Sequence, residues 1–409
     1  MTYVWSALPF LAVAAACAWC ARPRMHWWAL IAAGSALILL TAVFDNIMIG
    51  LGFFRYAREH LAGPSIGAAP IEDFAYPVAG ALLLPACWHI LRARRRGSPR
   101  EAAGRSGPDG PHPVAQRGPA VKNALIPHLI LSSRPASWIN TAYPFGAAYV
   151  VIAQEIDWAV VVGVLFFLVP YNIAMYGIND VFDYESDLRN PRKGGIEGAL
   201  LDPSLHRPIL ISAAACTAPF LLLLMLASGP ATWLALAVSM FAVVAYSAAG
   251  LRFKERPVLD SMTSSTHFVS PAVVGLTLAF DRTGAAVPAT AYIILVAFFL
   301  WGMAAHAFGA IQDVIPDREA RIASIATALG ARWTVRLAVV LWGLAGLFML
   351  LTTWPGPLAA VIALPYLAIS IPWWNVSDDA SARVNRSWRL FIWLNYFGGF
   401  VATILLILA

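Results

Sequence analysis

A run of acidic residues near the middle of the chain carries the clearest chemical signal in the sequence. Asp180, Asp183 and Asp187 follow i, i+3, i+7 spacing, and Asn179 lies four residues before Asp183. This spacing places the side chains on one face of a helix. Carboxylates on one face repel one another unless a cation joins them, and oxygen ligands of this kind suit Mg²⁺, which usually bridges to substrate phosphates. The four residues therefore predict a Mg²⁺ site, with Asp183 essential for catalysis.

A second acidic pair, Asp313 and Asp317, lies about 130 residues further along and has i, i+4 spacing. Basic residues follow the first acidic run and also lie between the two groups, where they can hold phosphate oxygens through charge-assisted hydrogen bonds. The alternative is that these basic residues are solvated loop charges. The candidates for binding a diphosphate, together with the amide of the first run, are Asn179, Arg192, Lys193, Arg252 and Lys254.

Three further acidic residues lie in the first quarter of the chain. Asp45 falls late in an apolar run, and Glu72 and Asp73 begin the next one. A carboxylate inside a membrane span is costly and usually functional, and desolvation makes a carboxyl group easier to protonate. We therefore interpret these residues as catalytic proton donors. The alternatives are that Asp45 is solvated at the interface and that Glu72 and Asp73 offset a helix dipole.

The elements that must position these residues are membrane helices. Of the 409 residues, 60% are hydrophobic and only 12% are charged, and the mean hydropathy is +0.69. Average soluble domains carry roughly 25% charged residues, so a soluble enzyme is excluded. The apolar runs are continuous, unlike the alternating strands of a barrel, and predict an all-α integral membrane protein. About twelve runs approach the length of a span: 3–20, 27–50, 74–91, 138–154, 158–179, 207–228, 231–250, 260–280, 288–310, 334–353, 356–373 and 388–408.

A change in composition predicts two membrane domains. Residues 92–123 are rich in Pro, Gly and Arg and almost lack large apolar residues, which is typical of a flexible linker. The expected domains are a three-helix domain over residues 1–92, a basic linker over 93–123, and a nine-helix bundle over 124–409.

The basic residues predict the orientation of the chain. All but three of the 28 Lys and Arg residues fall on loops of one side, the exceptions being Arg55, Arg58 and Arg282. By the positive-inside rule, the N-terminus lies outside a bacterial cell membrane, and the linker and both acidic groups are cytoplasmic. The net charge of +6 then requires no nucleic acid, and membrane lipid is the expected surroundings.

The larger domain resembles the UbiA superfamily of intramembrane prenyltransferases. That superfamily carries N-D-x-x-D-x-x-x-D in one cytoplasmic loop and D-x-x-x-D in a second, on nine helices, and both acidic groups match. Ser133–Arg134–Pro135 and Tyr246 also look like family positions. The resemblance implies that Mg²⁺ and basic residues stabilise a leaving diphosphate while an acceptor captures the allylic carbocation. Aromatic side chains are expected to line its pocket, with Tyr143, Phe145, Tyr171, Tyr176, Phe268 and Trp301 as candidates, whereas His267 and His306 are interpreted as packed or hydrogen-bonded.

The smaller domain resembles one subunit of the heterodimeric lycopene cyclases. Their signature is P-I-E-E/D followed by an aromatic residue, and this chain has Pro70–Ile71–Glu72–Asp73–Phe74. The resemblance implies protonation of a terminal polyene double bond. Because only one such unit is present, it also implies a second cyclase subunit as partner, or a small domain that is inactive alone.

These resemblances lead to one predicted function. The chain is expected to transfer dimethylallyl units from dimethylallyl diphosphate to the ends of lycopene, with Mg²⁺ as cofactor, and to contribute to cyclisation of the fifty-carbon carotenoid. The alternative is a UbiA-type enzyme acting on a quinone precursor or a glycerol ether lipid, with the small domain serving only for docking. A transporter is disfavoured because no clear repeat is present and the acidic groups lie at helix ends.

Overall fold

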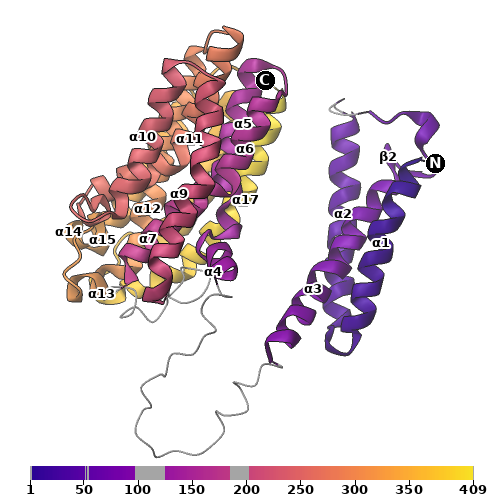
Figure 1. Ribbon diagram of the computed structural model, residues 1–409, viewed down its shortest axis with the longest axis horizontal. Coiled ribbons are helices and arrows are strands. Elements are labelled where there is room, and N and C mark those ends of the chain that lie inside the picture. The colour runs from indigo at the N-terminus through magenta and orange to yellow at the C-terminus, as the bar shows by residue number, and fades with distance from the viewer. Residues whose placement is uncertain (1, 51, 53–54, 97–124, 185–201, 409) are drawn as a thin grey trace, which may run out of the picture. The chain divides into compact units, whose positions relative to one another are not determined.

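The computed structural model describes residues 2–50, 52, 55–96, 125–184 and 202–408. The chain divides into two compact units, Met1–Gln116 and Arg117–Ala409, which are drawn in Figure 1. Three of the predicted site residues, Asp187, Arg192 and Lys193, lie outside the described residues.

The described part of the first unit contains three long helices and a small cap between the second and third. The helices are α1 (Thr2–Ala21), α2 (Trp27–Gly50) and α3 (Ala75–Arg96), and the cap holds η2 (Arg58–His60), the antiparallel strands β1 (Ser65–Ile66) and β2 (Ala69–Pro70), and η3 (Ile71–Phe74). Small residues, Ala18, Ala21 and Ala86, form the core with Met25, because small side chains let membrane helices approach closely. No residue of α2 is buried within the unit.

The second unit is a helical bundle. Its first half comprises α4 (Leu125–Ser132), η5 (Pro135–Ser137), α5 (Ile139–Ala153), α6 (Trp158–Leu168), α7 (Pro170–Phe182), α9 (Pro203–Leu226), α10 (Pro230–Ser247), η6 (Phe253–Glu255) and α11 (Leu259–Thr283). Its second half comprises α12 (Ala289–Ala310), η7 (Ile311–Asp313), α13 (Val314–Glu319), α14 (Ile325–Leu329), α15 (Ala331–Met349), η8 (Gly356–Ile362), α16 (Ala363–Ser370), η9 (Ile371–Trp373), η10 (Asp378–Val384) and α17 (Asn385–Leu408).

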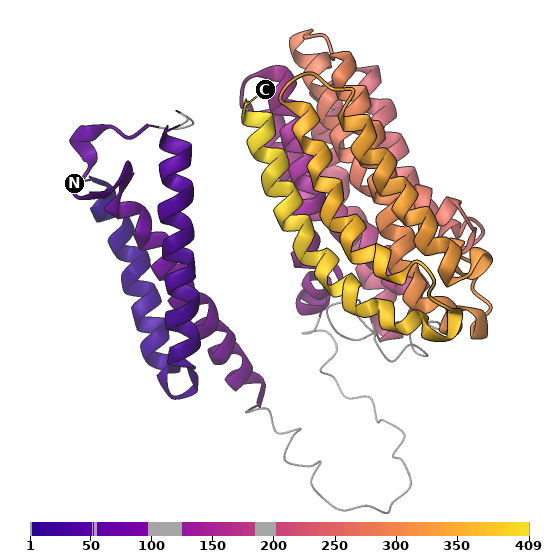
Figure 2. The same ribbon diagram turned by 180° about the vertical axis from the view of Figure 1, so that it is seen from behind.

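Each half of the bundle has its own aromatic core. The first core joins α5, α6, α7, α9, α10 and α11 around rings such as Phe166 and Phe167, and the second joins α12, α15, α16 and α17 around Trp342. Figure 2 shows α15 and α17 on the side of the bundle turned away from the viewer in Figure 1. Phe145 and Tyr171, two of the candidates for a pocket lining, are fully buried in the first core.

A proline breaks the span that leads to the first acidic motif. Pro170 begins α7 directly after α6 and has no backbone N–H to continue the ladder. The side chain of Asn172 satisfies two of the released carbonyls, donating to Phe167 O (2.8 Å) and Leu168 O (3.1 Å). Buried backbone carbonyls in a membrane need such partners, so this amide fixes the break and the direction of α7.

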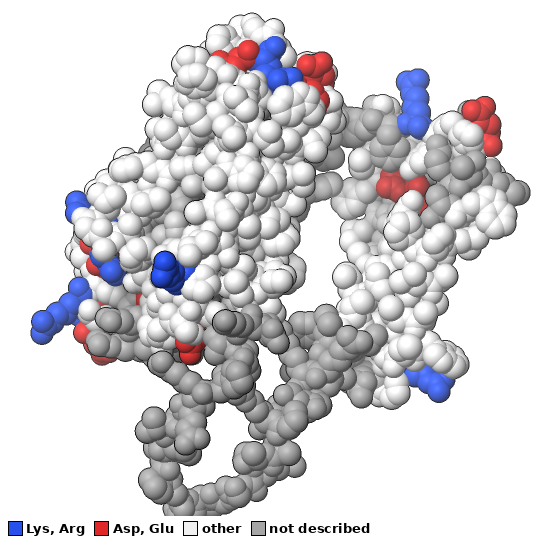
Figure 3. Space-filling model, in the orientation of Figure 1, with Lys and Arg blue, Asp and Glu red and all other residues white. Residues whose placement is uncertain are grey.

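The protein is an all-helical, multi-pass membrane protein apart from its two-residue strands. Eight described helices are long and apolar enough to span a membrane, and Ala7–Ala21 and Ile139–Ala153 are shorter apolar helices. Helices also occupy the other two predicted positions, although α3 ends in Arg residues and α11 contains Asp260 and His267. In Figure 3 the flanks of each unit are mostly uncharged, and the coloured side chains lie mainly toward the ends.

Candidate active sites

The first acidic motif lies at the C-terminal end of α7. Asp180 is 1% exposed and accepts hydrogen bonds from Ser132 Oγ (2.7 Å) and Arg134 Nη2 (3.2 Å). Asn179 accepts one from Ser247 Oγ through its side-chain oxygen (3.0 Å). A buried carboxyl group needs polar partners, and Ser132 and Arg134 supply them to Asp180.

Arg134 connects the start of the bundle to this motif. Its backbone adopts the left-handed conformation (φ 51°), which costs a residue other than glycine of the order of 1 kcal/mol. Its guanidinium carbon lies 4.2 Å from the Tyr176 ring centroid, and its Nε is buried without a hydrogen-bond partner in the described structure. Sequence reasoning reached Arg134 only through the resemblance, whereas its contacts place it directly against the acidic motif.

Lys254 provides a second cation at the same place. Its ammonium group forms an ion pair with Asp183, the residue that follows α7. Burial lowers the pKa of Lys254 to about 8, although the nearby Glu255 and Asp180 carboxylates act in the opposite direction. Arg252, two residues earlier, pairs with Glu255 instead. Of the two basic residues predicted here, Lys254 alone is paired with the acidic motif in the described contacts.

The second acidic pair begins at the end of η7. Asp313 is the last residue of η7, and Asp317 lies in the short helix α13. Tyr246, near the end of α10, lies within electrostatic range of both Arg134 and Asp317. The two acidic groups therefore approach the same part of the bundle from different elements.

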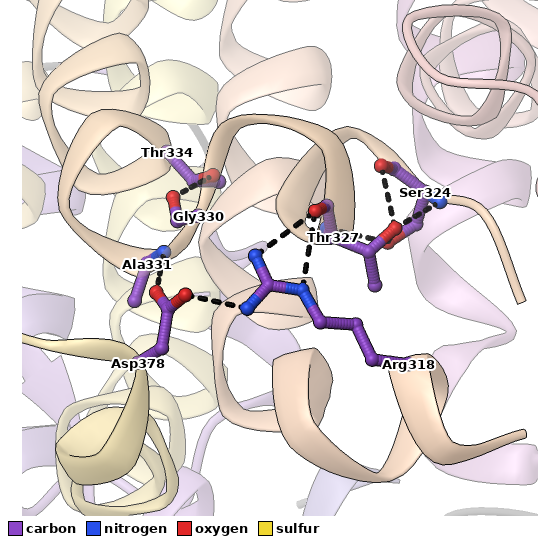
Figure 4. Close-up of polar contacts among 7 residues, drawn as sticks. All are labelled: Arg318, Ser324, Thr327, Gly330, Ala331, Thr334 and Asp378. Carbon is purple, nitrogen blue, oxygen red and sulfur yellow. Dashed lines mark hydrogen bonds and ion pairs between the residues drawn. The ribbon is translucent and has the colours of Figure 1, made fainter. Parts of the chain in front are cut away.

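Arg318 follows the second acidic pair but has a structural role. It donates to Asp378 Oδ2 (2.6 Å) and to the carbonyl oxygen of Thr327 (3.1 Å), as Figure 4 shows. Asp378 also accepts from the backbone N–H of Ala331 (2.7 Å). These contacts tie α13 to α14, α15 and η10, so the guanidinium holds the short helix that carries Asp317.

The donor set fits a metal–diphosphate group. Among the described residues no three His, Cys, Asp or Glu side chains gather as a ready metal site. The predicted set also includes Asp187, which lies outside them. Oxygen ligands at one end of the bundle suit Mg²⁺, and the partnerless Nε atoms of Arg134 and Arg252 suit an anion. The metal assignment of the six residues remains a prediction.

The first unit gathers its three predicted acidic residues with a tyrosine. Tyr56 Oη donates to Asp73 Oδ2 (2.7 Å), and the carboxyl groups of Asp45 and Asp73 lie close enough to interact. Burial raises the pKa of Asp73, assisted by the charge of Glu72 and opposed by the hydrogen bonds from Tyr56 and Asp45. No motif in the sequence indicated Tyr56.

Glu72 and Asn46 complete this cluster. Glu72 is 7% exposed, and its Oε1 accepts from the backbone N–H of Ala62 (2.5 Å), while its Oε2 is buried without a hydrogen-bond partner in the described structure. The amide of Asn46 donates to Ile66 O (2.8 Å) and accepts from Ala68 N (2.5 Å). A side chain at Gly67 would place its Cβ 2.1 Å from Asn46 Oδ1. Asn46 therefore anchors the strand pair beside Asp45.

Comparison with known proteins defines the class to which the chain belongs. Residues 142–395 match the model of the UbiA prenyltransferase family. Because the match covers more than half of the chain, the chain belongs to this family and is a prenyltransferase.

Two similar relatives indicate the biological role of this protein. The chain is 46% identical over 420 residues to the C(50) beta-cyclic carotenoids biosynthesis protein LbtBC of Dietzia sp. (strain CQ4), and the alignment covers 97% of this chain and 94% of the relative. It is 54% identical over 284 residues to the lycopene elongase/hydratase of Corynebacterium glutamicum, covering 68% and 96%. A solved UbiA homolog from Archaeoglobus fulgidus, bound to DMAPP and Mg²⁺, is 20% identical with a TM-score of 0.48 and covers 67% of this chain and 99% of its own. The protein is an enzyme of carotenoid biosynthesis.

Proposed function

We propose that the second unit transfers dimethylallyl units from dimethylallyl diphosphate to the ends of lycopene. The observation that carries this proposal is the pairing of Asp180 with Arg134 and of Asp183 with Lys254 at one end of an apolar bundle. A charged end suits a diphosphate, and an apolar bundle suits a polyene. The relatives named lycopene elongase/hydratase and C(50) beta-cyclic carotenoids biosynthesis protein favour lycopene as the acceptor.

The acidic and the basic residues proposed to bind the metal–diphosphate group have different roles in this reaction. Asn179, Asp180, Asp183, Asp187, Asp313 and Asp317 would hold Mg²⁺, which supplies charge stabilisation to the departing diphosphate. Arg134 and Lys254, with Arg192, Lys193 and Arg252, supply donors to the same oxygens. Negative charge grows on those oxygens as the allylic bond breaks, and cations already in place lower the barrier without reorganising. Exclusion of water by the surrounding helices protects the carbocation.

We also propose that the first unit donates the proton that closes the ring. The grouping of Asp45 and Asp73, with the Tyr56 hydroxyl donating to Asp73 Oδ2 (2.7 Å), is the observation that favours this function. Glu72 places a buried, partnerless oxygen beside them. The relative named C(50) beta-cyclic carotenoids biosynthesis protein LbtBC is matched over 97% of this chain. This span includes both units. A second cyclase subunit completes the site in this proposal, and α2 leaves its apolar surface available for it.

Expression of the whole chain in a lycopene-producing bacterium tests the transferase proposal. Mass spectrometry of the pigments should show products heavier by one and two five-carbon units, and chromatography should reveal whether rings form without a partner. Unchanged lycopene, with the protein verified in the membrane and dimethylallyl diphosphate present, would refute lycopene as the acceptor and favour a quinone precursor or a glycerol ether lipid. Elongated but acyclic pigment would separate the two proposals.

A further inference from the structure

A chain of three polar side chains lies in the bundle outside the acidic motifs. His306 uses both ring nitrogens: Nε2 lies 3.3 Å from the Tyr246 hydroxyl, and Nδ1 lies 3.0 Å from Ser261 Oγ. The residues come from α12, α10 and α11, so three helices build the chain. The hydrogen bonds confirm the sequence-based interpretation of His306 as bonded, but neither partner was predictable from spacing.

Two of these three hydrogen-bonded residues are not fully buried. His306 and Tyr246 are partly exposed, whereas the adjacent Ala305, Ala307 and Ser247 are buried. The partly exposed Tyr246 and His306 therefore lie at the edge of the packed cores, and the buried Ser261 contacts His306.

The position of Tyr246, Ser261 and His306 relative to the acidic motifs matters for the reaction. His306 precedes Asp313 by seven residues, which is about 10 Å along a helix. Tyr246 lies within electrostatic range of Arg134 and Asp317. A diphosphate bound at the charged end carries its allylic carbon on the side facing the apolar bundle. The carbocation would thus arise near the level of Tyr246 and His306.

The reaction leaves a proton that must be removed. As the terminal double bond of the polyene forms a carbon–carbon bond to the allylic carbon, the bond from that carbon to the diphosphate oxygen breaks. The positive charge then lies on a tertiary carbon of the polyene. Loss of a proton from a neighbouring carbon lets the electrons of that C–H bond form a new double bond, and no oxidant or reductant is required.

Resting on the transferase function proposed above, we infer that Tyr246 and His306 form the relay that accepts this proton. The Tyr246 hydroxyl receives the proton from carbon while its own proton passes to His306 Nε2, and the imidazolium later releases a proton to solvent. The relay uses the tautomer with a proton on Nδ1, which donates to Ser261 Oγ and leaves the Nε2 lone pair facing Tyr246.

A buried carboxyl group lies beside the relay. Asp260 is fully buried and accepts from the backbone N–H groups of Ser261 and Ile325, both at 2.7 Å. It also interacts electrostatically with His306. Ser261 thus connects His306 to the backbone beside this carboxyl group, which makes it a positioning residue.

The test compares bond breaking with product formation in the full-length protein in lipid vesicles. Lycopene and labelled dimethylallyl diphosphate are supplied, and released diphosphate and unsaturated elongated carotenoid are both measured. For His306→Gln the ratio of carotenoid to diphosphate should fall at least about tenfold, with hydroxylated carotenoid or dimethylallyl alcohol increasing. Ser261→Ala should lower the ratio about two- to threefold, as expected on loss of one hydrogen bond.

A different histidine, His267, provides the matched control. His267 packs against the Tyr246 ring, with centroids 5.2 Å apart, and His267→Gln should keep the ratio of the unaltered protein. An unchanged ratio in His306→Gln would overturn the relay and assign the proton to the released diphosphate. Loss of diphosphate release together with product would also overturn it, because His306 would then act in bond breaking. If the unaltered protein releases diphosphate but never elongates lycopene, the transferase proposal itself fails.

Discussion

The carboxyl groups of the two units have opposite surroundings. In the first unit Asp45 and Asp73 lie close enough to interact, and Asp73 accepts from the neutral hydroxyl of Tyr56. In the second unit Asp180 and Asp183 pair with the cations Arg134 and Lys254. Burial raises the pKa of Asp73, whereas a cationic partner favours the ionised form of a carboxyl group. We therefore expect the same residue type to serve as an acid in the first unit and as a partner of cations in the second.

This contrast explains how one chain can carry two unlike steps. Proton donation to a double bond needs a carboxylic acid, whereas binding a metal–diphosphate needs carboxylates. Neighbouring groups that push carboxyl pKa values apart are the usual means of assigning such roles. The following predictions alter one side of the contrast at a time.

The largest effect is expected for Asp183→Ala. Removing this carboxylate leaves Lys254 without its partner and removes a predicted Mg²⁺ ligand, so prenyl transfer should fall by about a hundredfold or more. Assays of elongated carotenoid in isolated membranes measure the loss, and immunoblotting verifies that the protein is still inserted. Normal transfer by this variant would rule out the metal assignment. Ring closure of a supplied acyclic fifty-carbon carotenoid should survive.

Asp73→Asn should have the complementary result. The amide cannot supply an acidic proton, so ring closure should fall about a hundredfold while elongated acyclic carotenoid accumulates. Chromatography of the pigments, with any partner subunit coexpressed, measures both. Glu59→Gln is the matched control, because this side chain lies in the same cap and is 79% exposed. Equal ring formation in both variants would remove Asp73 from the mechanism.

Tyr56→Phe tests the role of the Tyr56 hydroxyl as hydrogen-bond donor to Asp73. Loss of its hydrogen bond to Asp73 (2.7 Å) should reduce ring closure about five- to tenfold, because the acidic pair is no longer held in one arrangement. Tyr76→Phe, at a side chain that is 57% exposed, should have no effect. If the two variants behave alike in the pigment assay, Tyr56 does not position the acid.

The pH dependence should separate the two activities. Burial raises the pKa of Asp73, so its carboxyl group stays protonated to higher pH than a solvated one. The acid is present below that pKa and is lost as pH rises through it. Ring closure should accordingly decline with rising pH, while prenyl transfer should not decline over the same range. Parallel pH profiles for both activities in vesicles equilibrated on both faces would contradict this assignment.

The smallest effect is expected for Arg318→Gln. Its ion pair with Asp378 is partly exposed, and such pairs contribute about 0.2–1 kcal/mol to stability. The thermal unfolding midpoint of the detergent-solubilised protein should decrease slightly, and prenyl transfer should stay within about twofold. A loss as severe as that of Asp183→Ala would instead place Arg318 on the diphosphate.

Much of this protein is determined by local sequence. Continuous apolar runs predicted all-helical membrane architecture, and helices occupy each of the twelve expected positions, because span length and hydropathy are properties of short segments. The resemblance of the two acidic groups to the UbiA motifs likewise indicated the family of the second unit, which the family match confirms. The residues that carry it are Asn179, Asp180, Asp183, Asp187, Asp313 and Asp317. The helix α3 extends to Arg96, into the segment assigned to the linker, since arginine is compatible with a helix.

The tertiary structure decided which charged side chains form ion pairs with one another. Arg318 and Lys254 both follow or flank acidic residues in sequence, yet one pairs with Asp378 and the other with Asp183. Tyr56 and His306 gained their partners from elements 17 to 60 residues away. Spacing fixes only the face of a helix on which a side chain lies. Its partner, and hence its protonation and its chemistry, depends on which other helix packs against that face.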